Sequence, residues 1–337
     1  MLFPRDFLSQ GEALNSLLRK IHEGRMTHAL LISGEEGLGK WSLAQALAAA
    51  LLCEDDSPLA RPCGKCRACI QMESLSHPDL IVIRKGAPLV PSDVKTSIPV
   101  SDIQEMIRRV GLKGYEGTRR VVLVRHAEDM NDSAQNKMLK TLEEPPEETY
   151  FLMTCVNADK LLPTIVSRCQ LFKMHTWKTD EIVSQLEQKG YEHAKAEDAA
   201  LESGGSPGRA LQIAGDEAYW AFRDEILRDF FGCTERSRIS EISSRWKDRK
   251  DQADALFSAL NLYISRMMHA SLLESGEAMP LEKLPDPWKS WLSRSAPGDY
   301  VRLLDAVSLA RKRLMANVNF QIVVEQLIFA LLEALDS

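Results

Sequence analysis

A glycine-rich segment near the N-terminus carries residue types that can bind a phosphate group. It reads Gly34-Glu-Glu-Gly-Leu-Gly39-Lys40 and lies between an apolar run, Thr27–Ser33, and an Ala- and Leu-rich run, Trp41–Leu52. A strand that enters a helix through such a turn surrounds phosphate oxygens with backbone N–H groups, and the lysine adds a positive charge. The segment therefore predicts a phosphate-binding loop. Its candidate binding residues are Gly34, Gly37, Gly39 and Lys40.

Two positions that should hold Mg²⁺ beside this loop carry residues that cannot bind a cation. Ser or Thr should follow the loop lysine, but the residue is Trp41, whose indole has a donor and no acceptor. The strand-like run Arg120–Val124 is followed by Arg125-His126, where a hydrolytic enzyme needs carboxylates, and Glu128 is expected on the following turn. We therefore expect a nucleotide-binding fold with no Mg²⁺ site and no hydrolysis. Whether the loop holds ATP or ADP stays open, and an ATPase with unusual ligands is the alternative.

Four cysteines have the spacing of a structural zinc site. Cys63, Cys66 and Cys69 follow one another at three-residue intervals, and Cys53 at the end of the preceding helical run can be the fourth ligand. Four thiolates close a tetrahedral Zn²⁺ site and leave no position for water, so this metal would not be catalytic. The alternative is a set of reduced, unligated thiols. Cys155, Cys169 and Cys233 are expected to be small buried apolar residues.

Length and composition limit the classes of protein to consider. The chain has 337 residues, which suits two or three domains, and 45% of them are hydrophobic. The net charge of −6 argues against a protein that wraps nucleic acid over its whole surface. The apolar run Ala44–Cys53 is too short to span a bilayer, and polar residues interrupt the start of the chain where a signal peptide would lie. We expect a cytoplasmic protein.

The pattern of apolar runs predicts an α/β domain followed by helices. Strand-like runs alternate with helix-like runs over the first half, which favours a mostly parallel sheet with helices on both faces. The expected strands are Thr27–Ser33, Asp79–Ile83, Arg120–Val124 and Tyr150–Thr154; the expected helices between them are Trp41–Leu52, Val100–Val110 (capped by Ser101 or Asp102) and Asp132–Glu143.

Beyond about residue 175 only helical patterns remain. Helices are expected over Thr179–Lys189, Ala194–Glu202, Glu217–Phe231, Glu235–Trp246, Gln252–Leu273, Tyr300–Asn317 and Phe320–Leu335, with a loop at Gly276–Pro297. The expected domains are residues 1–175, a small helical lid at 176–214 and an all-helical domain at 215–337.

Several further motifs occur together with the phosphate loop and the cysteines. They are Gly24-Arg-Met-Thr-His-Ala-Leu30, His77-Pro-Asp79, Lys140-Thr-Leu-Glu-Glu-Pro-Pro146 and Ser167-Arg-Cys169. In this combination the sequence resembles bacterial DNA polymerase III clamp-loader subunits of the AAA+ superfamily, most closely the delta-prime type. The resemblance covers residues 1 to about 215, and only helical character matches beyond that point.

The resemblance implies the hydrolysis-deficient type of subunit rather than the motor type. Trp41 and Arg125-His126 replace residues that the motor keeps, and Cys155-Val156 stands where the motor has Thr-Thr. The sensing arginine of the motor would fall on Gly208, with Arg209 one residue late. The implied architecture is an AAA+ P-loop domain with a zinc insertion at about residues 53–69, a helical lid and a C-terminal collar that forms a ring.

The resemblance also gives a role to Arg168. Spacing alone favours an ordinary salt bridge, but in the family this arginine is a finger that reaches the nucleotide of the neighbouring motor subunit and assists its hydrolysis. The implied partners are the motor (gamma/tau) and delta subunits of a hetero-oligomeric ring. The ring loads the sliding clamp onto primed DNA, and polymerase activity belongs to the holoenzyme rather than to this chain.

Two rival functions and several surface features stay open at this point. The chain could be an active motor-type ATPase, or a zinc-dependent module that binds nucleic acid. Glu143-Glu144 could orient a neighbour or be a solvated helix end, and the apolar C-terminal positions could be core or interface. A basic stretch could face DNA or be a solvated surface. It comprises Arg108, Arg109, Lys113, Arg119 and Arg120.

Overall fold

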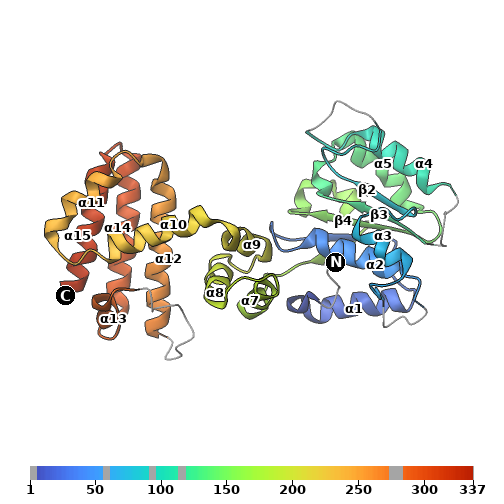
Figure 1. Ribbon diagram of the computed structural model, residues 1–337. Coiled ribbons are helices and arrows are strands. Elements are labelled where there is room, and N and C mark those ends of the chain that lie inside the picture. The colour runs from blue at the N-terminus through green and yellow to red at the C-terminus, as the bar shows by residue number, and fades with distance from the viewer. Residues whose placement is uncertain (1–5, 56–60, 91–95, 113–118, 273–283, 337) are drawn as a thin grey trace. The chain divides into compact units, whose positions relative to one another are not determined.

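The computed structural model describes residues 6–55, 61–90, 96–112, 119–272 and 284–336 (Figure 1). The chain divides into two compact units. The first runs up to Lys189 and includes Ser203–Leu211, and the second comprises Gly190–Glu202 and the residues from Gln212 onward.

The first unit is built on a five-stranded parallel sheet (Figure 1). The strand order is β2-β3-β4-β1-β5, so that β1 lies between β4 and β5 and pairs Leu30 with Leu152 on one side and with Gln170 on the other. This arrangement confirms the predicted α/β fold. The strands are β1 Ala29–Ser33, β2 Leu80–Ile83, β3 Arg120–Val124, β4 Thr149–Cys155 and β5 Gln170–Lys173.

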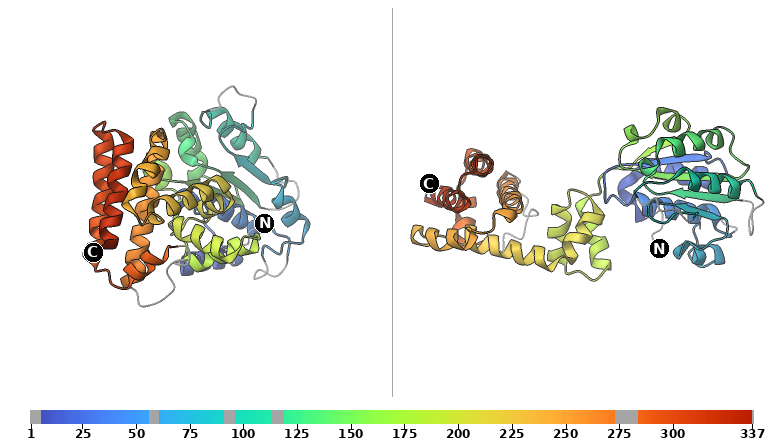
Figure 2. Two further views of the ribbon diagram at one scale, coloured as in Figure 1. Left: turned by 60° about the vertical axis from the view of Figure 1, so that its left-hand side comes forward. Right: turned by 90° about the horizontal axis from the view of Figure 1, so that it is seen from above.

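Helices cover both faces of this sheet, as the continuous apolar runs of the central strands require. On one face, side chains of α4 and α5 form a core with alternate residues of the strands, among them Leu31, Val122 and Met153. On the other face α2 packs against β1, β3 and β4 (Figure 2, right). The helices of this unit are α1 Gly11–His22, α2 Lys40–Leu52, α3 Arg67–Glu73, α4 Val100–Val110, α5 Asp132–Glu143, α6 Pro163–Val166 and α7 Thr179–Gln188.

Three local expectations for this unit need correction. Strand β5 was not expected, because an edge strand with only Phe172 buried gives a weak apolar signal. The N-cap of α4 is Pro99 rather than Ser101 or Asp102. Asp102 is instead buried, and its carboxylate accepts hydrogen bonds from the backbone N–H groups of Leu89 and Val90.

The second unit is helical, as expected (Figure 2, left). Its core is rich in aromatic residues, with Trp246, Trp288 and Tyr263 fully buried. The C-terminal helix contributes most of its apolar side chains to this core, whereas Ile322 is exposed. The helices are α8 His193–Glu202, α10 Glu217–Ile226, a π-helix Leu227–Phe231, α11 Ile239–Trp246, α12 Ala253–Leu272, α13 Asp286–Leu292, α14 Pro297–Met315 and α15 Phe320–Asp336.

Two helices lie where the sequence suggested none. Helix α9, Pro207–Gly215, begins in the first unit directly after the glycine-rich turn Gly204-Gly205 and ends in the second. Helix α13 lies within the expected loop Gly276–Pro297, of which residues 276–283 fall outside the described residues. Proline at the first turn of both helices is compatible with a helix start, which explains why a proline-rich pattern concealed them.

A buried group of charges ties α8 to α10 and α12 within the second unit. Arg223 lies 2.8 Å from an Asp198 carboxylate oxygen and 3.2 Å from one of Glu202. Arg266 lies 3.5 Å from Glu202, so that two cations face two carboxylates in the interior. Removal of one partner would leave a buried charge without full compensation. Such a change is expected to destabilise the second unit strongly.

Among the described residues, none of the helices combines the length and the apolar character needed to span a bilayer.

Candidate phosphate loop, cysteine cluster and arginine turn

The phosphate loop joins β1 to α2 in the predicted position. Gly37 and Gly39 adopt φ angles of 80° and 91°, a left-handed conformation that glycine reaches without a steric cost. Lys40 is the first residue of α2, and its ammonium donates hydrogen bonds of 2.6 Å to the carbonyl oxygens of Gly34 and Glu35. The lysine of the cradle is therefore bonded to the loop itself.

Donors from the following lid segment satisfy the other carbonyl groups of the loop. The Ser206 hydroxyl donates to Glu36, and the backbone N–H of Gly208 donates to Gly37 over 2.9 Å. The indole N–H of Trp177 donates to Leu38 over 3.1 Å. We call the bonds from Ser206 and Gly208 the lid clasp. These bonds satisfy loop carbonyl groups from within the chain.

A cation and an aromatic ring meet at the two positions where magnesium ligands were looked for in the sequence. The Arg125 guanidinium carbon lies 5.8 Å from the centre of the Trp41 ring, a distance typical of a cation–π contact. Arg125 directly follows β3, and Trp41 is the second residue of α2. The two residues that the sequence analysis singled out therefore meet in space, and together they put a positive charge at this end of the sheet.

The carboxylate Glu128 lies on the turn that follows β3, as expected, but its interaction with the loop lysine was not predicted. Glu128 lies in a 3-10 turn, and its Oε1 accepts a 2.8 Å hydrogen bond from the backbone N–H of Val156, at the end of β4. Burial lowers the pKa of Lys40, and Glu128 is the strongest of the charges that oppose this effect. Sequence spacing did not predict the interaction between Glu128 and Lys40. His126, which precedes this turn, adopts a left-handed conformation with φ of 53°.

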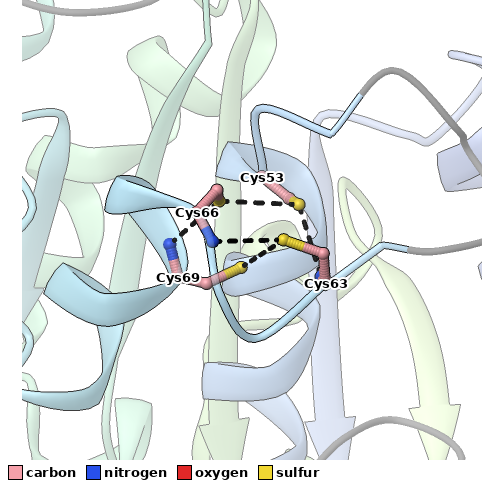
Figure 3. Close-up of side chains that lie close together, drawn as sticks. All are labelled: Cys53, Cys63, Cys66 and Cys69. Atoms are coloured by element: carbon pink, nitrogen blue, oxygen red, sulfur yellow. Dashed lines mark hydrogen bonds between the residues drawn. The ribbon is translucent and has the colours of Figure 1, made fainter.

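The four predicted cysteines come together in one cluster (Figure 3). Cys53 ends α2, Cys66 caps the start of α3, and all four sulfur atoms lie within 4.8 Å of one another. The Cys53–Cys66 and Cys63–Cys69 sulfur pairs are 3.9 Å and 4.0 Å apart. Sulfurs about 2.3 Å from a tetrahedral Zn²⁺ would be about 3.8 Å apart, so the cluster has the dimensions of a metal site.

The surroundings of the sulfurs also suit thiolate ligands. Backbone N–H groups of Cys63, Cys66 and Cys69 each donate to the sulfur of another cluster cysteine over 3.3–3.4 Å. The N–H of Lys65 is the main reason why the pKa of Cys63 is lowered to about 7. Burial raises the pKa of Cys53 and Cys69, so that their thiolates need a cation nearby to form. The residues therefore fit a bound metal ion.

Two of the other three cysteines are buried, as expected, whereas Cys169 is only partly buried. Cys155 and Cys233 are buried, and Cys169 packs against the core of the first unit. Burial raises the pKa of Cys155 and of Cys169 to about 12. These thiols therefore stay protonated and unreactive at neutral pH.

Arg168 lies on the turn that follows α6 and points to a different set of partners. One terminal nitrogen donates to the carbonyl of Thr164 over 2.9 Å, and the other donates to the carboxylate of Glu143 at the end of α5. The side chain is 32% exposed. The candidate finger, Arg168, is therefore partly exposed at the surface of the first unit.

The basic stretch is largely neutralised by its own neighbours. Arg108 and Arg109 both bond to Glu105, and Arg119 bonds to Glu148. Arg120 is buried and donates to the carbonyls at the end of α4. Lys113 lies outside the described residues. The arrangement favours a solvated surface over a face for nucleic acid.

Together, the glycine loop between β1 and α2, the parallel sheet and the helical lid define a P-loop protein of the AAA+ class. A family model described as "DNA polymerase III, delta subunit" matches residues 9–178. This match covers half of the chain, and the chain belongs to that family. The resemblance to the delta-prime type of clamp-loader subunit is confirmed.

The chain is also similar to curated delta' and tau subunits of DNA polymerase III. The chain is 26% identical over 331 residues to the DNA polymerase III subunit delta' of Bacillus subtilis (strain 168), with 96% of both chains covered. It is 34% identical over 214 residues to that of Escherichia coli (strain K12), which covers 63% of this chain and 61% of the relative. The tau subunit of Escherichia coli (strain K12) is 34% identical over 198 residues, covering 58% of this chain and 29% of tau.

Among solved structures, a DNA polymerase III gamma subunit-related protein from Thermotoga maritima is 18% identical, with 95% of this chain and 99% of that chain covered. Its TM-score is 0.38. The assignment of the fold rests on the strand order and the loop described above.

Proposed function

We propose that this chain is a non-hydrolysing subunit of the bacterial clamp loader, a stator that assists ATP hydrolysis in a neighbouring motor subunit. The observation that carries the proposal is the contact between Trp41 and Arg125 at the place where magnesium ligands would be needed. Hydrolysis of a phosphoanhydride depends on a metal ion that neutralises the developing charge. A guanidinium at that place would repel Mg²⁺, and an indole has no lone pair to bind it.

The state of the loop lysine supports the same conclusion. In active phosphate loops the lysine ammonium binds phosphate oxygens. Here the ammonium of Lys40 is bonded to the carbonyls of Gly34 and Glu35, and the lid clasp closes over the adjoining Glu36 and Gly37. Gly34, Gly37, Gly39 and Lys40 therefore act chiefly as a structural element, and any bound ATP or ADP would be held without a metal ion.

Arg168 supplies the chemistry that this chain contributes to the complex. A guanidinium stays protonated at all physiological pH values and grips two phosphate oxygens at once. The side chain is partly exposed on the first unit, so a neighbouring subunit has access to it. In trans it would stabilise the charge on the transferring phosphoryl group, as arginine fingers do.

Cys53, Cys63, Cys66 and Cys69 hold a structural Zn²⁺ in this proposal. The cluster offers four sulfur ligands at tetrahedral spacing, which leaves no open position for a substrate. The ion would connect the end of α2 to the start of α3 and so stabilise the insertion between them.

The partners are the motor (gamma/tau) and delta subunits in a hetero-oligomeric ring, and through the ring the sliding clamp and primed DNA in the cytoplasm. The domains in this proposal are residues 1–175, 176–214 and 215–337, the last being the collar. A separate role as a nucleic-acid-binding module is not supported, since the arginines of the basic stretch are paired or buried.

ATP turnover by the purified chain tests the stator proposal. We expect no release of phosphate above background with Mg²⁺ present, and the same baseline for Lys40→Ala. Turnover that disappears in Lys40→Ala would identify the chain as a motor-type ATPase and would contradict the proposal.

A further inference from the structure

The turn that carries Arg168 is anchored to the core of the first unit by side chains on both sides of it. Ile165 is fully buried, and Cys169 packs against the same core, so that residues on both sides of Arg168 are anchored. The carbonyl of Thr164 accepts hydrogen bonds from the Ser167 hydroxyl and from Arg168, over 3.1 Å and 2.9 Å. Each residue of the Ser-Arg-Cys motif therefore takes part in holding this turn.

The second anchor of Arg168 comes from α5, which is itself attached to the turn. Leu142 is buried in the core that contains Ile165, and Glu143 follows it as the last residue of the helix. The amide oxygen of buried Gln135, near the start of α5, accepts a 2.8 Å hydrogen bond from the backbone N–H of Leu162. The spacing between α5 and the α6 turn is thus fixed at two points.

The position of Glu143 is electrostatically unfavourable for the helix alone. The C-terminus of a helix carries partial negative charge, which repels a carboxylate there. Glu144 directly follows, so that two acidic residues lie at the same helix end. A single exposed ion pair adds little to stability, so stability does not explain this placement. Among the described residues, the charged side chain that contacts Glu143 is Arg168. This contact accounts for a carboxylate at the end of α5.

We infer that Glu143 is a positioning residue for Arg168, an inference that rests on the proposed function of Arg168 as a finger in trans. Thr164 and Glu143 hold the two terminal nitrogens from different elements, which restricts the guanidinium before a neighbour arrives. Arginine has five N–H donors, so the remaining ones stay available for phosphate oxygens. A guanidinium that is already oriented loses less freedom when the phosphoryl group is transferred.

The test uses the clamp-loader complex reconstituted with this chain, with clamp and primed DNA present. Glu143→Gln removes the charge and keeps the shape, and Glu144→Gln makes the same change one residue further on as a matched control. We expect Glu143→Gln to lower the kcat of ATP hydrolysis about tenfold, with little change in KM for ATP, because misplaced catalytic groups lose rate rather than substrate affinity. Glu144→Gln should match the wild type.

A double-variant cycle distinguishes positioning from other roles. On an Arg168→Ala background, Glu143→Gln should cause no further loss, because there is no guanidinium left to orient. A wild-type kcat for Glu143→Gln, with the Arg168→Ala complex impaired, would overturn this inference and leave the proposed function intact. An equal loss in both backgrounds would also overturn it. Full activity of the Arg168→Ala complex would remove the proposed function and this inference with it.

Discussion

The phosphate loop and the Ser-Arg-Cys turn both carry a cation suited to phosphate, yet the two cations are placed in opposite ways. The Lys40 ammonium is buried and bonded to two carbonyls of its own loop. Arg168 lies at the surface, with 32% of its side chain exposed, and is held at its terminal nitrogens by one carbonyl and one carboxylate. One cation is bonded within its own loop, and the other is partly exposed at the surface of the first unit.

Under the proposed function, the contrast describes a nucleotide-binding fold that no longer hydrolyses nucleotide itself and serves a neighbouring subunit. The loop keeps its backbone shape because lysine, lid and tryptophan donors satisfy it from within the chain. In the proposed function, Trp41 and Arg125 lie at positions that would bind Mg²⁺ in a hydrolytic subunit. The turn, in contrast, retains each residue of its motif. Changes at the loop should therefore affect stability, and changes at the turn should affect a neighbour's activity.

The largest effect is expected from Arg168→Ala. Arginine fingers contribute a factor of about 10³–10⁵ in rate, so hydrolysis at the site that receives this residue should fall by at least 10³-fold. Because the side chain is partly exposed, the melting temperature of the purified chain should barely change. Single-turnover ATP hydrolysis by the complex and calorimetry of the chain measure the two quantities. An unchanged rate would show that Arg168 does not assist hydrolysis in a neighbouring subunit.

Loss of the cysteine cluster should affect stability and leave the turn unaffected. Wild-type protein should contain one Zn²⁺ per chain by elemental analysis, and Cys66→Ser should contain none. Metal loss is among the largest single stability effects, so the free energy of unfolding should fall by about 4 kcal/mol or more. Cys155→Ala, outside the cluster, should keep its zinc and serves as the control. Native protein without zinc would contradict the metal assignment.

A smaller effect is expected where the lid clasp meets the loop. A Cβ atom on Gly208 would lie 3.0 Å from both the Cα and the carbonyl oxygen of Gly37, so Gly208→Ala must push the clasp away from the loop. Such overpacking costs about 1–3 kcal/mol of unfolding free energy. Gly111→Ala is the matched control, since its new Cβ would lie 3.5 Å from the nearest atom.

Chemical denaturation of both variants measures this difference. Equal stability of Gly208→Ala and Gly111→Ala would show that the clasp does not support the loop. A normal rate of hydrolysis in a complex that contains Gly208→Ala would show that the loop affects stability and not the neighbour's activity.

The sequence predicted the features that depend on local pattern. Continuous apolar runs marked the central strands, glycine spacing marked the loop, and cysteine spacing marked the cluster around Cys63 and Cys66. Each of these signals lies within a short stretch of chain, because buried strands, phosphate loops and thiol ligands each impose their own residue types.

Features that depend on distant parts of the chain were missed. Glu128 lies on the turn after β3, as expected, but its hydrogen bond to Val156 and its interaction with Lys40 were not predicted. The lid clasp joins Gly37 to Gly208, and Asp102 satisfies a loop instead of capping its own helix. Such pairings are decided by tertiary packing, which no local pattern encodes.

Helix α2 has a further consequence for the first unit. It begins at the phosphate loop, ends at Cys53, and is buried along most of its 13 residues, a length of about 20 Å. This helix therefore connects the glycine turn to the first cysteine of the cluster through the packed interior of the first unit. We expect loss of the thiol cluster to loosen the C-terminal end of the same helix whose N-terminal residue is Lys40.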